Sequence, residues 1–128
     1  MSFDRPAISV NGVTLRFGDY VVQRNVSFSV LHGEIFVIMG GSGCGKSTML
    51  RAMTGLLRPS EGNISYDGEA LWSVDEEKRA EMQRRFGILF QSGALWTSMT
   101  LAENVALPLT QYTSLKSDEI SSIVSLKI

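Results

Sequence analysis

One glycine-rich segment of the chain has residue types suited to binding phosphate. Its residues, Gly40-Gly41-Ser42-Gly43-Cys44-Gly45-Lys46-Ser47, match the pattern G-x-x-x-x-G-K-[ST] at every fixed position. Glycines allow backbone conformations that other residues avoid, so successive N–H groups can face a phosphate. Lys46 has a compact charge that can reach the β- and γ-phosphates. The hydroxyl of Ser47 can bind Mg²⁺, and Thr48 can contact the α-phosphate. The alternative interpretation is a glycine-rich turn that merely precedes a lysine.

The residues on either side of this segment predict the strand and helix that such a loop needs. Residues 35–39 form a continuous apolar run, which is typical of a strand buried on both faces of a parallel sheet. An amphipathic helix pattern follows the loop and is expected to stop at Pro59. The apolar side of this helix is expected to comprise Leu50, Met53, Leu56 and Leu57.

The first third of the chain predicts an antiparallel β-layer. Apolar and polar residues alternate in several short runs between residues 8 and 30. Asn11-Gly12 is compatible with a two-residue hairpin turn or with a bulge inside one longer strand. Residues 62–72 predict a further hairpin around Asp67-Gly68.

Capping patterns predict the remaining helices. Ser73-Val74-Asp75-Glu76 and Thr100-Leu101-Ala102-Glu103 have the spacing of capping boxes, and Ser117 is expected to be the N-cap of a last helix. The helix that follows Thr100 is expected to end at Pro108. Residues 86–90 predict a second buried strand.

Composition and charge restrict the class of protein. The chain has 128 residues, of which 44% are hydrophobic and 20% charged, with a net charge of −1. This composition is typical of a globular protein, and the net charge lacks the basic excess of a nucleic-acid-binding protein, so no nucleic-acid partner is expected. Cys44 is the single cysteine, which excludes an intrachain disulfide and fits a reducing compartment. With no apolar signal-peptide core and no membrane-spanning run, a soluble, intracellular chain is expected.

The phosphate motif alone is shared by kinases, GTPases, transport ATPases and motor ATPases. Further motifs, in order, make nearly the whole chain resemble the ATP-binding subunit of an ABC transporter. These motifs are segments 13–18 and 26–30, Gly33-Glu34, the phosphate loop with Thr48, Thr54-Gly55-Leu56, Pro59, Glu61-Gly62, Asp67-Gly68, and Phe90-Gln91, which matches the family's Q-loop.

The resemblance implies an α/β fold: a P-loop NTPase core with a RecA-like parallel sheet and an N-terminal antiparallel β-subdomain. The β-layer is expected at about 7–34 and 62–72, and the P-loop core at about 35–58 and 86–91. The Q-loop and the start of a helical subdomain are expected at about 91–128.

The resemblance also assigns roles to two residues outside the loop. Phe17 falls where the family places an aromatic ring that stacks on adenine, although a strand residue facing the core is the alternative. Gln91 falls where the family places a glutamine that contacts Mg²⁺ and the attacking water. The implied set is therefore Lys46 and Gln91 for catalysis, Ser47 and Gln91 for Mg²⁺, and Phe17 with residues 40–48 for ATP.

A segment after Gln91 is the candidate surface for a protein partner. It carries Leu95, Trp96 and Met99, and the resemblance implies that it receives a cytoplasmic helix of a membrane permease. The alternative is that Trp96 folds into the core. The resemblance further implies a homodimer in the full-length protein, on the cytoplasmic face of the inner membrane. Residues 90–95 and 104–109 are similar to the phospholipid-trafficking and organic-solvent (toluene) resistance branch of the family, the Mla type.

Three motifs of the family are not found downstream of Gln91: the apolar strand ending in Asp-Glu, the Leu-Ser-Gly-Gly signature and the switch histidine. The chain is therefore expected to be the N-terminal portion of such a subunit, truncated before the helical subdomain is complete. Its parent is expected to hydrolyse ATP, and the chain alone weakly or not at all. An isolated nucleotide-binding module is the main alternative, and a small P-loop kinase a weaker one.

Overall fold

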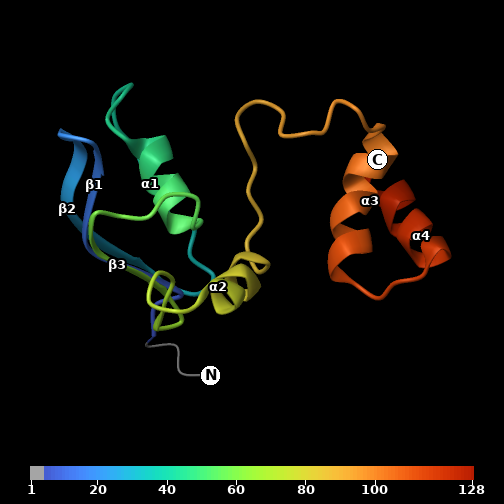
Figure 1. Ribbon diagram of the computed structural model, residues 1–128, viewed down its shortest axis with the longest axis horizontal. Coiled ribbons are helices and arrows are strands. Elements are labelled where there is room, and N and C mark those ends of the chain that lie inside the picture. Colours follow the sequence, from blue (N-terminus) through green and yellow to red (C-terminus); the bar gives the residue numbers. More distant parts are fainter. Residues whose placement is uncertain (1–4) are drawn as a thin grey trace. The chain divides into compact units, whose positions relative to one another are not determined.

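The first part of the chain, up to Gly87, is built on an antiparallel sheet (Figure 1). The computed structural model describes residues 5–128, which divide into this unit and a second unit at Ile88–Ile128. The strands are β1 (Ile8–Phe17), β2 (Tyr20–Val30), β3 (Glu61–Tyr66) and β4 (Glu69–Ala70), in the order β2-β1-β3-β4. The predicted β-layer and the hairpin around Asp67-Gly68 are thus confirmed.

The Asn11-Gly12 pair forms a bulge within β1 rather than a hairpin turn. Val10 pairs with Phe28 of β2 and Val13 pairs with Val26, so β1 carries one extra residue between the two pairs. Gly12 has φ 58°, and its N–H donates to Ser27 Oγ at 2.8 Å. The bulge keeps β1 as one strand.

The helix after the glycine-rich loop covers one face of the sheet. This helix, α1 (Lys46–Met53), places its buried residues against apolar residues of β1 and β3. The hydrophobic cluster between the sheet and α1 comprises Val10, Val13, Leu15 and Ile64 from the strands and Met49, Ala52 and Met53 from α1.

The predicted apolar face and end of this helix were partly wrong. Leu50 and Leu56 are 47% and 57% exposed, because the buried face is rotated toward Met49 and Ala52. The helix ends at Met53 and not near Pro59. Gly55 adopts φ 77°, and the N–H of Leu56 turns back to the carbonyl of Arg51 at 2.8 Å, which closes the helix.

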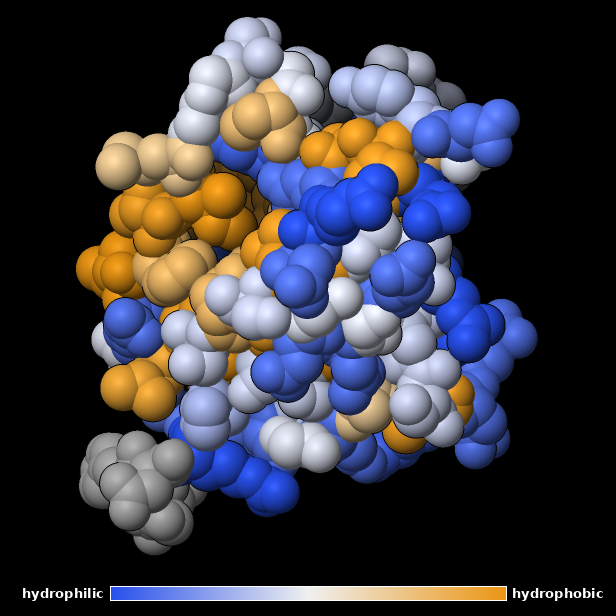
Figure 2. All heavy atoms as spheres, turned by 90° about the vertical axis from the view of Figure 1, so that its left-hand side faces the viewer, coloured by the Kyte–Doolittle hydropathy of each residue, from blue (hydrophilic) through white to orange (hydrophobic). Residues whose placement is uncertain are grey.

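The two segments predicted as buried strands, residues 35–39 and 86–90, are in no ladder of the described sheet. In the first segment Phe36 stacks on Phe28 at 4.9 Å, whereas Ile35 and Met39 are 92% and 85% exposed. The expectation of burial on both faces was wrong for this chain, because a parallel strand needs paired neighbours and covering helices that the described elements do not supply. Hydrophobic residues accordingly reach the surface (Figure 2).

Helix α2 (Glu76–Gln83) begins later than the capping pattern predicted. Its N-cap is Asp75, whose Oδ1 accepts from the N–H of Lys78 at 2.8 Å. The box starting at Ser73 does not form, because the carboxylate of Asp75 accepts the N–H of Lys78 and makes Asp75 the N-cap.

The second unit consists of an irregular segment and two helices that pack on each other, α3 (Leu101–Tyr112) and α4 (Ser117–Lys127). The capping box of Thr100 and Glu103 is confirmed. Pro108 lies inside α3 and does not end it, so that prediction was wrong; packing of α3 on α4 outweighs the one backbone hydrogen bond that a proline lacks. Ser117 is the first residue of α4, and Lys116 precedes it as N-cap. Among residues 5–128, no helix has the length and apolarity needed to cross a membrane.

Candidate functional site

The glycine-rich loop leads directly into α1 and is held in shape by its glycines. Gly43 and Gly45 have φ values of 80° and 93°, in the left-handed region that glycine favours. Gly45 is the N-cap of α1, and its carbonyl accepts from the N–H of Met49 at 2.9 Å. The loop thus ends where the positive pole of the helix begins, which suits an anion.

The side chain of Lys46 closes the loop on itself. Its Nζ donates to the carbonyls of Gly40 and Gly41, each at 2.7 Å, and lies 3.6 Å from the Sγ of Cys44. A Cβ on Gly40 would lie 2.5 Å from that sulfur, so a side chain at position 40 would require the side chain of Cys44 to move. The one fixed charge of the motif is therefore inside the loop, where phosphate oxygens would need it.

A cavity of about 310 Å³ joins this loop to the turn between β1 and β2. Its lining residues are Phe17, Tyr20, Val22, Gly43, Gly45, Lys46, Ser47 and Thr48. Phe17 is 54% exposed, so it does not face the core as the alternative interpretation held. The structure thus brings the predicted aromatic residue and much of the predicted phosphate loop to one cavity.

Sequence reasoning missed two residues at this cavity. Tyr20, 67% exposed, adds a second aromatic ring, and Val22 forms part of the wall. The signal for Tyr20 was available, since an aromatic residue directly after the Gly18-Asp19 turn must lie near Phe17 in a hairpin. Phe17 and Tyr20 are indeed register partners.

Gln91, the predicted Mg²⁺ and water ligand, lies in the second unit. It is exposed and outside regular secondary structure. Its role toward Mg²⁺ therefore stays a prediction that the described geometry of the phosphate loop does not test.

The predicted partner segment is organised by Asn104, which the sequence analysis missed. Its Oδ1 accepts from the N–H of Trp96 at 2.7 Å, and its Nδ2 donates to the carbonyls of Trp96, Met99 and Thr100 at 2.9 to 3.2 Å. Leu95 and Trp96 are 59% and 63% exposed. Within the second unit Trp96 is thus a surface residue, held at its backbone.

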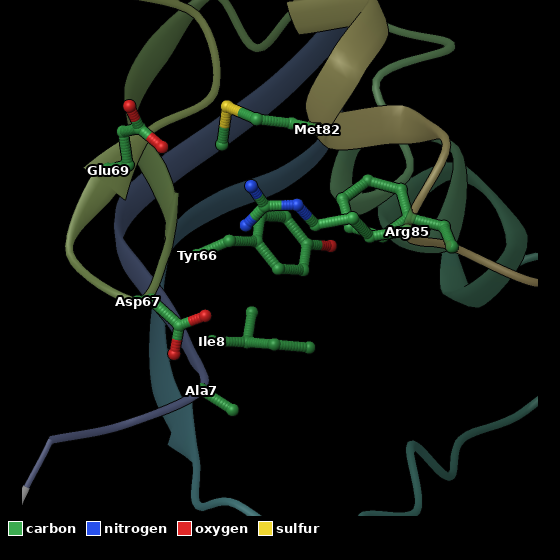
Figure 3. A pocket seen from close by; sticks show the side chains of 8 residues that line it. Ala7, Ile8, Tyr66, Asp67, Glu69, Met82 and Arg85 are labelled. Carbon is green, nitrogen blue, oxygen red and sulfur yellow. The ribbon is translucent and has the colours of Figure 1, made fainter. Parts of the chain in front are cut away.

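The first unit has a second cavity, of about 260 Å³ (Figure 3), which the sequence analysis did not predict. Its lining residues are Ala7, Ile8, Tyr66, Asp67, Glu69, Met82, Arg85 and Phe86. Tyr66 donates its hydroxyl to the carbonyl of Met53 at 2.6 Å, and its ring lies 4.4 Å from that of Phe86. Burial raises the pKa of Tyr66 to about 12. Figure 3 shows Asp67 and Glu69 on the side of the β3–β4 turn and Arg85 reaching across from the segment after α2.

The loop pattern, the helix that follows it and the shared cavity define the class of phosphate-loop proteins. Within that class, a sequence profile described as ABC transporter matches residues 23–126, and the chain belongs to that family.

Curated relatives and solved structures agree with this membership. The chain is 41% identical over 95% of its length to the probable ribonucleotide transport ATP-binding protein mkl of Mycobacterium tuberculosis, of which it covers 34%. It is 39% identical over 94% of its length to the intermembrane phospholipid transport system ATP-binding protein MlaF of Haemophilus influenzae, of which it covers 46%. The chain therefore spans less than half the length of these relatives.

The solved structures confirm the predicted fold class. A dimeric, post-hydrolysis structure of the ATP-binding cassette MJ0796 with ADP and Pi has a TM-score of 0.82 at 29% identity, covering 93% of this chain and 54% of that one. A second dimeric structure of the same bacterial ABC transporter cassette has a TM-score of 0.80 at 31% identity, covering 90% and 53%.

Proposed function

We propose that this chain binds Mg-ATP as part of the ATP-binding subunit of an ABC transporter. The observation that carries the proposal is the cavity that joins the exposed ring of Phe17 to Lys46 and Ser47. A nucleotide has an aromatic base at one end and phosphates at the other, and this cavity has a matching group at each end.

The residues of the loop divide the binding of the nucleotide among them. Backbone N–H groups of the loop and of the helix N-terminus donate hydrogen bonds to the phosphate oxygens, while Lys46 balances their charge. Gly40 and Gly45 support the fit of the nucleotide to the loop, because the loop is closely packed at both positions. An added Cβ would clash with Cys44 at Gly40 and with Val22 at Gly45. The hydroxyl of Ser47 supplies an oxygen ligand to Mg²⁺, which when bound neutralises charge on the β- and γ-phosphates.

Hydrolysis belongs to the parent subunit in this proposal. Lys46 would stabilise charge on the γ-phosphate, and Gln91 would orient the attacking water and contact Mg²⁺. The chain alone is expected to turn over slowly or not at all. An isolated nucleotide-binding module is the second candidate function, which the absence of turnover in the full-length subunit would favour.

Transport of lipids or other hydrophobic solutes is the proposed use of the ATP. The name of the MlaF relative, a phospholipid transport ATP-binding protein, supports this. The exposed segment of Leu95, Trp96 and Met99 is the proposed surface for a membrane permease, on the cytoplasmic face of the inner membrane. The dimeric cassette structures support a homodimer of the full-length subunit.

Calorimetric titration of the purified chain with Mg-ATP tests the binding proposal. Saturable binding that weakens about tenfold or more in Lys46→Ala would support it, since the substitution removes the only side-chain charge of the motif. Absence of binding, or equal affinity of the two proteins, would contradict it. A phosphate-release assay on the same samples decides the expectation about turnover: robust Mg-dependent hydrolysis that Lys46→Ala abolishes would refute it.

A further inference from the structure

A glutamine outside the motif contacts the phosphate loop. Gln23 lies on β2, and its Nε2 donates to the backbone carbonyl of Cys44 at 3.1 Å. Because a carbonyl only accepts hydrogen bonds, the nitrogen end of the amide must face it. The orientation of this side chain is therefore set by the loop.

The same part of the loop rests directly on β2. A Cβ added to Gly45 would lie 2.6 Å from Cγ1 of Val22 and 3.1 Å from Cγ of Gln23. The backbone at Gly45 thus lies closer to the strand than a residue with a side chain permits.

Peptide geometry gives this hydrogen bond a consequence for the nucleotide site. The Cys44–Gly45 peptide is trans, and in a trans peptide the C=O and N–H groups point in opposite directions. By holding the carbonyl of Cys44, Gln23 directs the N–H of Gly45 away from itself. Gly45 lines the cavity together with Lys46, so this donor belongs to the group that would meet a phosphate.

The other end of the amide makes Gln23 a costly residue for folding. Its Oε1 is buried and, in the part of the chain that the structure describes, has no hydrogen-bond partner. A buried acceptor without a donor destabilises a protein relative to an apolar side chain of the same shape. A polar residue at such a position indicates a role other than stability.

We propose that Gln23 is a positioning residue of the nucleotide site, which acts through the Cys44–Gly45 peptide to aim a phosphate-binding N–H group. The inference rests on the proposed function, because the donor is useful only if the cavity takes a nucleotide. Phosphate-loop affinity then depends on a side chain of β2, the strand that also carries Tyr20 of the cavity.

Gln23→Met tests the role, since methionine has nearly the shape of glutamine and no hydrogen-bonding amide. Gln83→Met is the matched control: Gln83 Nε2 donates to the carbonyl of Thr54 at 3.1 Å, so the same bond is removed beyond the other end of α1. Three quantities are measured on each protein: the melting temperature, the maleimide labelling rate of Cys44 without nucleotide, and the affinity for Mg-ATP.

The expected pattern separates positioning from stability. Gln23→Met keeps or raises the melting temperature. It increases the labelling rate of Cys44 and lowers the affinity for Mg-ATP, both by about threefold or more, as the loss of one hydrogen bond implies. Gln83→Met leaves labelling and affinity unchanged. If Gln23→Met melts at a lower temperature, Gln23→Leu replaces it as the apolar variant.

Two results would overturn the inference: labelling and affinity unchanged in the Gln23 variants, or equal changes in Gln83→Met. If the unsubstituted chain binds no Mg-ATP, the proposed function fails. The labelling rates without nucleotide then still decide whether Gln23 holds the loop.

Discussion

The side-chain nitrogen of Lys46 lies 2.7 Å from the carbonyl oxygen of Gly40, at the first position of the glycine-rich loop. The same nitrogen meets the carbonyl of Gly41 at an equal distance. A small ammonium group can stand between two adjacent carbonyls, whereas a planar guanidinium is larger and fixed in its fork geometry. The loop conformation thus depends on the size of the cation at position 46 and not only on its charge.

Lys46→Arg is therefore expected to lose most of the Mg-ATP affinity despite keeping the charge, by about tenfold. Calorimetry measures the affinity, and the melting temperature checks that the fold is unchanged. Affinity equal to that of the unsubstituted chain would show that charge alone suffices.

Phe17→Ala is expected to weaken Mg-ATP binding by about 1 kcal/mol, a factor of about five, because a stacked ring is lost. Phe17→Tyr keeps the ring face and should bind within about twofold of the original chain. Tyr112→Ala serves as the control, since Tyr112 is an aromatic residue of similar exposure on α3. The stacking role is contradicted if Phe17→Ala and Tyr112→Ala bind alike.

The sequence allowed the phosphate loop and Phe17 to be predicted because both depend on local patterns. The glycine motif determines much of its own geometry through left-handed glycines such as Gly43 and Gly45, and Phe17 ends a strand next to a turn. Gln23 could not be predicted, since its contact to Cys44 spans 21 residues and arises only when β2 packs against the loop. A lone glutamine in a strand carries no signal of that packing.

Two errors in the predicted fold have the same origin. Residues 35–39 have the apolar composition of a buried strand, but burial depends on neighbouring strands that composition does not reveal. Pro108 is a local helix breaker, yet α3 continues past it to Tyr112 while packing on α4. In both cases a tertiary contact, present or missing, decided the outcome against the local pattern.

Because of Tyr66, the stability of the first unit is expected to change with pH in the alkaline range. Its pKa is raised by burial from 10.0 to about 12, so above pH 10 the unfolded chain releases this proton before the folded chain does. The folded state then binds more protons, and the free energy of unfolding falls as pH rises from about 10 to 12, by at most 1.4 kcal/mol per pH unit. The slope is smaller than this limit because the side chain is only partly buried.

Urea denaturation of the chain and of Tyr66→Phe at pH 8 to 11 measures this pH dependence of the free energy of unfolding. Tyr66→Phe should be less stable at pH 8 by about 1 kcal/mol, since the carbonyl of Met53 loses its donor. The difference between the two proteins should shrink above pH 10. A constant difference across this range would argue against titration of Tyr66.

Asn104→Ala is expected to loosen the segment from Trp96 to Thr100, which loses four hydrogen bonds made by one side chain. Limited chymotrypsin digestion should cut after Trp96 faster in the variant, by about tenfold or more, because local opening becomes easier. Thr110→Ala, which removes one hydrogen bond to the carbonyl of Ala106 further along α3, is the control. Equal cleavage rates in the two variants would show that Asn104 does not hold the segment.

The last prediction concerns Cys44, which is exposed within the phosphate loop. Its sulfur lies 3.6 Å from Lys46 Nζ, so phosphates drawn to that nitrogen would stand beside the thiol. Mg-ATP at saturating concentration should therefore protect Cys44 from a maleimide, slowing the labelling rate about tenfold, whereas adenosine, which lacks phosphates, should not. The protection should disappear in Lys46→Ala. Equal labelling with and without Mg-ATP in a chain shown by calorimetry to bind it would mean that the phosphates lie elsewhere than in the loop.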